Sequence, residues 1–227
     1  QTAQKPTEGN GDNGNNGDES AKVGDVLEAP EKTVGLEDLK DLTISASFSA
    51  PSIGPDRDLV YAVSNSDTGI RFYEKNVFKM TENQQDVMES ICLPGAEGYL
   101  FYSRMGSSEF TPNNMTEQFG SNEGYFHCQL ANFGVGYQAW LKADGFTKCE
   151  DAKVLDRDCF VYEVSFTGKM GQTKQDAVIC VDKETGLWLK MDVKVEGDTI
   201  TRAVSSIAYT ATVFPGTQPV GMAEQVI

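Results

Sequence analysis

Residues 158–195 read DCFVYEVSFTGKMGQTKQDAVICVDKETGLWLKMDVKV, and they decide the fold of this chain. The stretch contains three runs rich in β-branched and aromatic residues, separated by the turn sequences GKMG and DKETG. Folding it about the first turn sets Cys159 opposite Cys180, and folding it about the second sets Ile179 opposite Leu189. Because side chains alternate between the two faces of a strand, each register assigns every residue to one side. Both turns give the same assignment, which predicts three antiparallel strands.

The two faces of these strands differ in polarity. One face collects Phe160, Tyr162, Val164, Phe166, Ala177, Ile179, Val181, Leu187, Leu189, Met191 and Val193. The other collects Glu163, Lys174, Asp176, Lys190, Asp192 and Lys194, with Cys159, Cys180 and Trp188 among them. An antiparallel sheet with one apolar and one polar face needs a cover on the apolar side.

Length and charge restrict the function classes. The chain has 227 residues, of which 39% are hydrophobic, and its formal net charge is −15. A strongly acidic chain does not attract a polyanion, so we expect no nucleic-acid partner. No apolar run approaches the roughly 20 residues that a membrane-spanning helix needs.

The first 31 residues are rich in Gly, Asn, Asp and Glu and contain few apolar residues. Such a segment cannot bury enough surface to offset its loss of entropy, so residues 1–31 are predicted to be a disordered tether. The run DNGNNG within it resembles a calcium loop, but Gly14 stands at the third ligand position. Residues 32–227 are then expected to form a single domain. A lipidated cysteine upstream of residue 1 is the hypothesis for what the tether joins to a membrane.

The five cysteines leave two alternatives open. Each can be a small buried apolar residue, or Cys159 and Cys180 can form a cross-strand disulfide, because the inferred register sets them side by side. The disulfide would indicate an oxidising compartment. No CxxC occurs and the chain has a single histidine, His127, so we expect no metal site.

Helices are expected at residues 34–42, 81–92 and 122–144. The second has a capping-box spacing between Thr81 and Gln84, although a loop leading to a strand is also possible. The third carries a stripe at four- and three-residue spacing, with Gly145 as its C-cap. The stripe consists of Phe126, Leu130, Phe133, Tyr137 and Trp140. It is the predicted cover for the apolar face of the sheet.

Further strands are expected at residues 42–50, 59–64, 69–75 and 98–104 from their alternation and β-propensity. A fourth strand of the central meander follows the turn at residues 196–199. A bulge at Ser205 and Ser206 would return Ile207 and Tyr209 to the apolar face.

No signature of catalysis is present. The sequence has no GxSxG, HExxH or P-loop motif. The spacing Gly134-x-Gly136-x-x-Ala139 loosely matches a dinucleotide fingerprint, but it lies within the helical stripe and not between a strand and a helix. We therefore expect no enzymatic activity and no cofactor.

The central stretch resembles the LolA/LolB-like carriers of lipoproteins and lipids, a group that includes related bacterial outer-surface lipoproteins. The resemblance rests on a strand of the form C-x-x-Y-x-V followed by a strand that ends in V-D-x-x-T-G-L-x-L-K. These residues are Cys159, Tyr162, Val164, Val181, Asp182, Thr185, Gly186, Leu187, Leu189 and Lys190. The resemblance implies an α+β fold, in which helices cover the concave face of a strongly curved antiparallel sheet, an open half-barrel that can hold acyl chains. It also implies an extracytoplasmic, membrane-tethered setting at the cell surface or in the periplasm.

Two functional hypotheses follow. In the first, a monomeric, lipid-anchored domain binds a hydrophobic ligand between the sheet and the helix stripe. The residues predicted to line this site are Phe133, Tyr137, Trp140, Phe160, Tyr162, Leu189, Met191, Ile207 and Tyr209. The same residues can equally fill an ordinary core. In the second, the exposed sheet face binds a protein partner, with Trp188 beside Lys190 as the anchor.

Overall fold

The structure, a computed structural model, describes residues 24–52, 54–67, 69–136, 141–168, 174–195 and 198–209. The strands are β1 (Val26–Leu27), β2 (Asp41–Ser49), β3 (Arg57–Ser66), β4 (Gly69–Thr81), β5 (Gln84–Gly95), β6 (Gly98–Met105), β7 (Thr111–Asn113), β8 (Leu141–Lys148), β9 (Ala152–Val154), β10 (Arg157–Gly168), β11 (Gln175–Asp182), β12 (Trp188–Val195) and β13 (Asp198–Ala208). The helices are α1 (Thr116–Phe119) and α2 (Asn122–Ala131).

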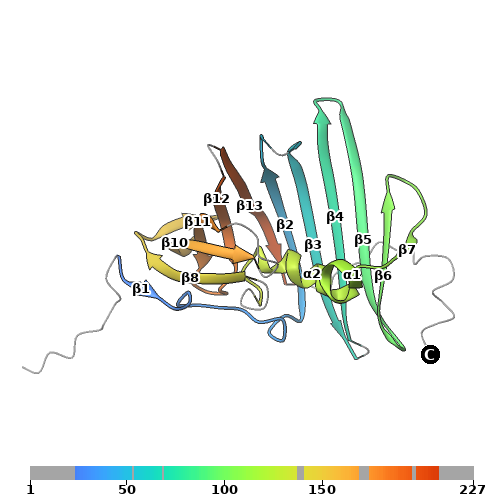
Figure 1. Cartoon of the computed structure of the whole chain (residues 1–227), viewed down its shortest axis with the longest axis horizontal. Coiled ribbons are helices and arrows are strands. Elements are labelled where there is room, and N and C mark those ends of the chain that lie inside the picture. Colours follow the sequence, from blue (N-terminus) through green and yellow to red (C-terminus); the bar gives the residue numbers. More distant parts are fainter. Residues whose placement is uncertain are drawn as a thin grey trace, which may run out of the picture.

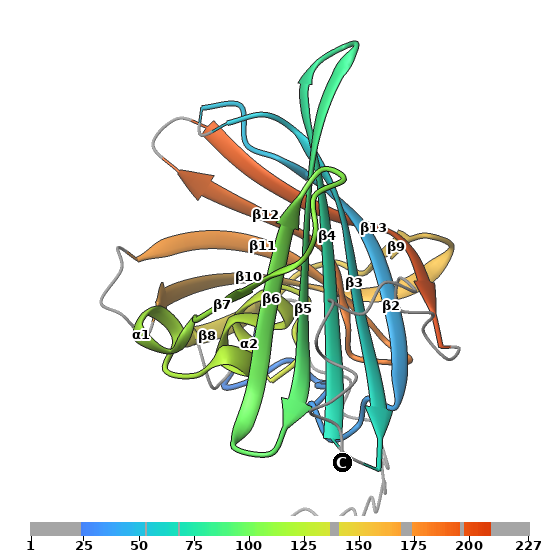
Figure 2. The same ribbon diagram turned by 90° about the vertical axis from the view of Figure 1, so that its right-hand side faces the viewer.

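All the described strands form one antiparallel sheet. Its order is β1-β8-β10-β11-β12-β13-β2-β3-β4-β5-β6-β7, and β9 pairs with β10 outside this path. Figures 1 and 2 show that the sheet curls, so that the arm containing β8, β10 and β11 runs across the arm containing β2 to β6, with α2 between them. The architecture is an open, curled sheet and is mainly β. The predicted α+β class overstated the helices, which cover only part of the inner face.

The sorting of residues into two faces in the central strands is largely confirmed. Tyr162 pairs with Ile179, and Ile179 pairs with Met191, so these apolar side chains share the inner face. Each predicted register is nevertheless displaced by two residues. A shift of two preserves the faces because side chains repeat every second residue along a strand. Turn length, which alternation does not determine, sets the register.

The displaced register separates the two cysteines that were expected to pair. Cys159 lies opposite Asp182, and Cys180 lies opposite Val161. The predicted register that would join Cys159 and Cys180 is therefore wrong, and both thiols are free in the structure.

A β-bulge reverses the predicted position of Trp188. The β11–β12 register shifts between Cys180 and Val181, so that Lys190 pairs with Cys180 while Trp188 pairs with Val181. Leu189 occupies the extra position, and Trp188 turns to the inner face, where it is only 2% exposed. Trp188 is therefore not a surface anchor, and the predicted interaction patch beside Lys190 is wrong.

Two of the expected helices are strands or turns. Residues 81–92 belong to the β4–β5 hairpin, in which Thr81 pairs with Gln84 across the turn. The alternative of a strand in this segment is the one that the structure shows. Residues 34–42 contain a parallel bridge between Val34 and Val135 and then turns before β2 begins, with the Leu39 amide bonded to the Leu36 carbonyl. Pairing with neighbouring strands outweighs the local helical pattern in the hairpin.

The third expected helix is shorter than its aromatic stripe. α2 ends at Ala131, and Gly134 and Gly136 both adopt left-handed φ angles, +82° and +58°. These are conformations that glycine reaches at little cost and that terminate helices. Residues 141–145, expected to be the last turn and cap of that helix, belong to β8 (Leu141–Lys148) instead.

One remaining expectation is confirmed near the C-terminal end of the described chain, and one is wrong for the residues described at its N-terminal end. The predicted bulge is present in β13 between Val204 and Ser206, and it returns Ile207 to the side of Ile44. Of the segment predicted to be a tether, residues 24–31 are described, and β1 within it pairs with β8. No helix among the described residues is long and apolar enough to cross a membrane.

Candidate ligand-binding site

The helix α2 lies on the inner face of the sheet and is held at both ends. Ser121 caps its N-terminus by accepting a hydrogen bond from the Gly124 amide at 3.1 Å. The Phe126 ring stacks on Phe72 with the centroids 5.3 Å apart. Beyond the C-terminus, the Phe133 carbonyl accepts a bond from the Trp188 amide at 2.9 Å. The helix therefore connects the two arms of the sheet.

Several residues that were predicted to line a ligand site are packed in the interior. Phe133, Tyr162 and Leu189 are at most 1% exposed, and Met191 is 8% exposed. The Tyr162 hydroxyl accepts a bond from the Glu31 amide at 3.1 Å, and burial raises the pKa of Tyr162 to about 12. In this state of the protein these side chains fill the core.

The other predicted lining residues lie further out or outside the described residues. Phe160 and Ile207 are partly buried, and the Phe160 ring has the ammonium groups of Lys148 and Lys183 each 4.7 Å from its centroid. Tyr209 is 55% exposed. Tyr137 and Trp140 are not among the described residues. The structure thus does not bring the predicted set together around one opening.

A different part of the inner face lies beyond α2. It is formed by cross-strand neighbours in β13, β2, β3 and β4. Phe48 pairs with Arg202 on one side and with Arg57 on the other, and Arg57 in turn pairs with Phe78. All four residues are partly buried, neither sealed in the core nor fully exposed. We call Arg57, Arg202, Phe48 and Phe78 the arginine–aromatic row.

Guanidinium groups and rings alternate in the arginine–aromatic row. The guanidinium carbon of Arg57 lies 4.1 Å from the Phe48 centroid and 5.6 Å from that of Phe78. Arg202 lies 5.6 Å from the Phe48 centroid and 5.8 Å from that of Phe133. These distances are within the range of cation–π attraction. Phe48 therefore attracts both positive charges, although the two charges still repel each other.

Burial dominates the electrostatics of Arg202. Desolvation lowers the pKa of Arg202 to about 10, and the charge of Arg57 adds to the decrease. Its Nε and Nη1 atoms and the Nε of Arg57 are buried without a hydrogen-bond partner. Leaving such donors unpaired is unfavourable, because they have lost water and gained nothing in exchange.

A second polar cluster lies beside this row, under α2. The Glu74 carboxylate is 2% exposed and accepts bonds from the hydroxyls of Tyr61 and Tyr125. The Tyr61 hydroxyl also lies 3.3 Å from the amide oxygen of Gln129 on α2. Burial, followed by the charge of Glu74, raises the pKa of both tyrosines. Glu74 is thus already engaged by two donors.

The arginine–aromatic row was missed in the sequence for identifiable reasons. Arg57 lies just before the strand predicted at residues 59–64, in a stretch where Pro and Gly favour a loop. Extending the alternation of Leu59, Tyr61 and Val63 back by one step would have placed Arg57 on the same face. Arg202 likewise alternates with Ile200 and Val204. A lone arginine within an alternating apolar face is the signal that was available.

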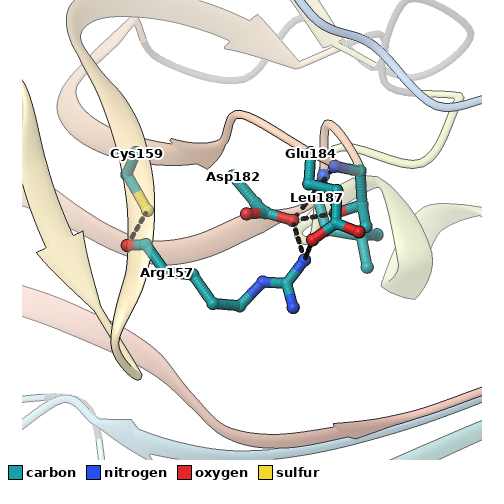
Figure 3. A network of polar contacts seen from close by, with 6 residues as sticks. Arg157, Cys159, Asp182, Glu184 and Leu187 are labelled. Atoms are coloured by element: carbon teal, nitrogen blue, oxygen red, sulfur yellow. Dashed lines mark hydrogen bonds and ion pairs between the residues drawn. The ribbon is translucent and has the colours of Figure 1, made fainter.

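The turn sequence DKETG contains a polar network that is structural (Figure 3). Asp182 is 1% exposed and accepts bonds from Arg157 Nη2 at 2.8 Å, from the Thr185 amide at 3.0 Å and from the Thr185 hydroxyl. Glu184 is a second acceptor for Arg157, at 2.7 Å. This network closes the β11–β12 turn, so the side chains of Asp182 and Thr185 have a structural role that requires no ligand.

Replacing Asp182 with asparagine is expected to lower the free energy of unfolding at pH 7 by about 1–3 kcal/mol. Burial alone would raise the pKa of Asp182, but the bonds from Arg157 and Thr185 outweigh it, and the pKa lies below its usual value. A depressed pKa stabilises the fold above the unfolded-state pKa, about 3.9, and this stability is lost as the pH falls through the folded-state pKa. The difference between wild type and D182N should therefore shrink below pH 4, as measured by urea unfolding.

Asp158 provides the control for this prediction. It pairs with Lys153 at 3.1 Å, but both side chains are mostly exposed. D158N should change the unfolding free energy by less than about 1 kcal/mol at any pH. A D182N effect that is equally small would show that the network does not stabilise the turn.

No cluster of three or more His, Cys, Asp or Glu side chains that could hold a metal ion occurs among the described residues. The candidate site consists of aromatic rings and guanidinium groups. Such groups can bind a ligand through cation–π contacts and hydrogen bonds.

Comparison with known proteins assigns no family. No protein-family model and no curated protein matches this chain. Among solved structures, the chain is similar to LprF from Mycobacterium bovis, with a TM-score of 0.49, 10% identity, and coverage of 79% of this chain and 90% of that chain. A DUF1329 family protein from Desulfovibrio piger ATCC 29098 gives a TM-score of 0.37 at 15% identity, covering 78% of this chain and 88% of that one. MucB gives 0.34 at 14% identity, covering 82% and 57%. At these values the similarities assign neither a family nor a function to this chain.

Proposed function

We propose that this domain binds a hydrophobic ligand with acyl chains against the inner face of its curled sheet and catalyses no reaction on it. The observation that carries the proposal is that α2 covers only part of the inner face of the sheet. The ten-residue α2 seats on one part of the inner face, while Phe48, Phe78, Met88 and Ile200 on that face remain partly exposed. Large, partly exposed apolar side chains on the inside of a curved sheet suit the binding of a flexible apolar chain.

An extracytoplasmic, membrane-tethered location is part of this proposal. It rests on the composition of the first 23 residues, which are rich in Gly, Asn, Asp and Glu, and on the sequence resemblance of the central strands. The free cysteines lend it no support, because no disulfide joins the described thiols.

The test uses native mass spectrometry of the full chain after exposure to mixed membrane lipids, followed by organic extraction. A neutral apolar fluorophore, 1-N-phenylnaphthylamine, provides a parallel titration. We expect the wild type to retain an acyl species and to enhance the fluorescence. Met88→Lys places a charge on the inner face, where Met88 pairs with Asn76 and Met105, and should weaken both signals at least tenfold.

Val87 supplies the matched control. It comes directly before Met88 in β5, is also partly buried, and pairs with Val77 on the outer face. Val87→Lys adds the same charge to the opposite side and should leave binding within twofold of wild type. An apo mass with no fluorescence change in the folded wild type would refute the proposed function, and equal losses in the two variants would refute the inner face as its location.

A further inference from the structure

We propose that Arg57 and Arg202 form a binding site for an anionic group, a phosphate or a carboxylate, on the inner face of the sheet. The inference rests on the proposed function in one respect, namely that the anion is carried as the head group of the acyl ligand. The site itself is argued from the arginines alone.

The unpaired donors of the described chain are concentrated at this position. Four buried side-chain nitrogen or oxygen atoms among the described residues have no hydrogen-bond partner, and all four are guanidinium nitrogens. Three belong to Arg57 and Arg202. The fourth is on Arg157, whose guanidinium already bonds Asp182 and Glu184. Buried donors are normally satisfied, so a pair of adjacent exceptions indicates an acceptor that the protein itself does not supply.

The local charge also favours an anion. The chain as a whole has a formal net charge of −15, yet no ion pair joins either arginine to a carboxylate within the described ranges. The neighbouring buried carboxylate, Glu74, is bound to Tyr61 and Tyr125. Two like charges on either side of Phe48 repel each other, and an anion between them would remove both the repulsion and the unmet hydrogen bonds.

The aromatic neighbours of the two arginines leave their hydrogen-bonding capacity unused. The guanidinium carbon of Arg57 lies over the rings of Phe48 and Phe78, and that of Arg202 lies over the rings of Phe48 and Phe133. A ring attracts the positive charge but accepts no ordinary hydrogen bond from the N–H groups, which match the oxygens of a phosphate or carboxylate. Both arginine residues keep partial exposure, so a ligand can approach them from solution, although the three unpaired nitrogens are themselves buried.

The position of the pair fits an amphipathic ligand. Arg57 and Arg202 stand in the same inner-face row as Phe48 and Phe78, which are partly exposed. Ile200, two residues before Arg202 on the same face, is also partly exposed. An anionic head at the arginines would therefore place its chains along an apolar surface. The chemical class that this arrangement recognises is an acyl lipid with a phosphate or carboxylate head group.

The test compares two lipids that differ only in the head group, dioctanoyl phosphatidic acid and dioctanoylglycerol, by titration calorimetry on the full chain. We expect the wild type to bind the phosphate lipid at least tenfold more tightly. The double variant Arg57→Gln/Arg202→Gln should lose this preference, so that it binds the two lipids with affinities within about twofold of each other. A preference that survives in the folded double variant, or a wild type that binds both lipids equally, would overturn the anion site.

Inorganic phosphate distinguishes the source of the anion and separates the two proposals. If neither lipid binds but millimolar phosphate raises the Tm of the wild type and not of the double variant, the proposed function fails and the anion site stands with a free anion as its ligand. If neither lipid nor phosphate has an effect, both proposals fail.

The Tm of the ligand-free protein separates an anion site from a structural role, because the two predict changes of opposite sign when Arg202 is replaced. Arg202→Met removes a buried, unpartnered charge and should raise the Tm of the apo protein by roughly 2–8 °C while abolishing the effect of phosphate. A lower Tm would mean that Arg202 supports the fold, and it would overturn the site. Should the double glutamine variant fail to fold, Arg57→Lys and Arg202→Lys keep the charge but lose the planar fork, and each should reduce the phosphate-lipid preference severalfold.

Discussion

Replacing Phe126 with alanine is expected to lower the free energy of unfolding by about 3–5 kcal/mol. Phe126 is 1% exposed and fills the space between α2 and the sheet. Its ring stacks on Phe72 at 5.3 Å with an interplanar angle of 19°, and it contacts Phe101 at 5.7 Å. The loss combines the transfer free energy of the ring with the energy of the cavity it leaves, because β4 and β6 cannot close on the gap. Urea unfolding monitored by circular dichroism measures the change.

Phe119 in α1 serves as the control for this substitution. Its ring also contacts an aromatic neighbour, Tyr125 at 5.2 Å, but it is only partly buried and α1 has no fully buried residue. Phe119→Ala should lower the unfolding free energy by about 1–2 kcal/mol, since less apolar area is exposed. If the two substitutions had equal effects, α2 would not be anchored on the sheet through Phe126.

Replacing Gly134 with alanine is expected to lower the free energy of unfolding by about 2–5 kcal/mol. Its φ of +82° disfavours any side chain by about 1–2 kcal/mol. A Cβ atom there would also lie 2.4 Å from Cδ1 and 2.5 Å from Nε1 of Trp188. Trp188 cannot move away, because it is buried, packs against Phe166 at 5.7 Å and bonds the Phe133 carbonyl through its amide. Overpacking of this kind adds about 1–3 kcal/mol.

Gly136 separates the two contributions. Its φ is +58°, but no atom lies within 4 Å of a Cβ built at that position. Gly136→Ala should therefore show the conformational part alone, about 1–2 kcal/mol. Comparable losses for the two alanine variants in thermal or urea unfolding would show that the contact with Trp188 is unimportant.

These two predictions bear on the function because they concern the cover of the inner face. Phe126 fixes the middle of α2 against β4 and β6, and Gly134 packs the segment after its C-terminus against β12. A helix held at these two places is not expected to swing away to admit a ligand. The proposed ligand therefore has to enter along the partly exposed arginine–aromatic row, and the Met88 and arginine variants are designed for that region.

The sequence predicted much of the sheet but little of the helical cover. The β-strands at residues 42–50, 59–64, 69–75 and 98–104 are present, because alternation and β-propensity are local signals that the sheet reinforces. The spacing of Thr81 and Gln84 favours a helix start, but the same spacing is compatible with a two-residue hairpin turn, and the hairpin is what the structure shows. Only the pairing of β5 with β4 and β6 decides between the two.

The candidate site was predicted less well than the fold. Phe133, Tyr162 and Leu189 were expected to line a ligand, and the structure places them in the packed interior. The arginines that lie beside open apolar surface were overlooked. Apolar residues at interior positions look alike in a sequence, whether they fill a core or line a pocket, because periodicity reports the face of a strand and not what lies opposite it.

The amino-acid sequence by itself determined which side chains share a face, because the two-residue period of a strand is a local property that survives a register shift of two. It did not determine where α2 ends, because a helix was predicted to residue 144, whereas the structure ends α2 at Ala131 and gives Gly134 and Gly136 conformations that other residues avoid. Only the tertiary structure decided the register, the bulge at Leu189 that buries Trp188, and the meeting of Arg57 with Arg202 across Phe48. These depend on turn lengths and on pairing between strands distant in the chain, and their energies exist only after the sheet has assembled.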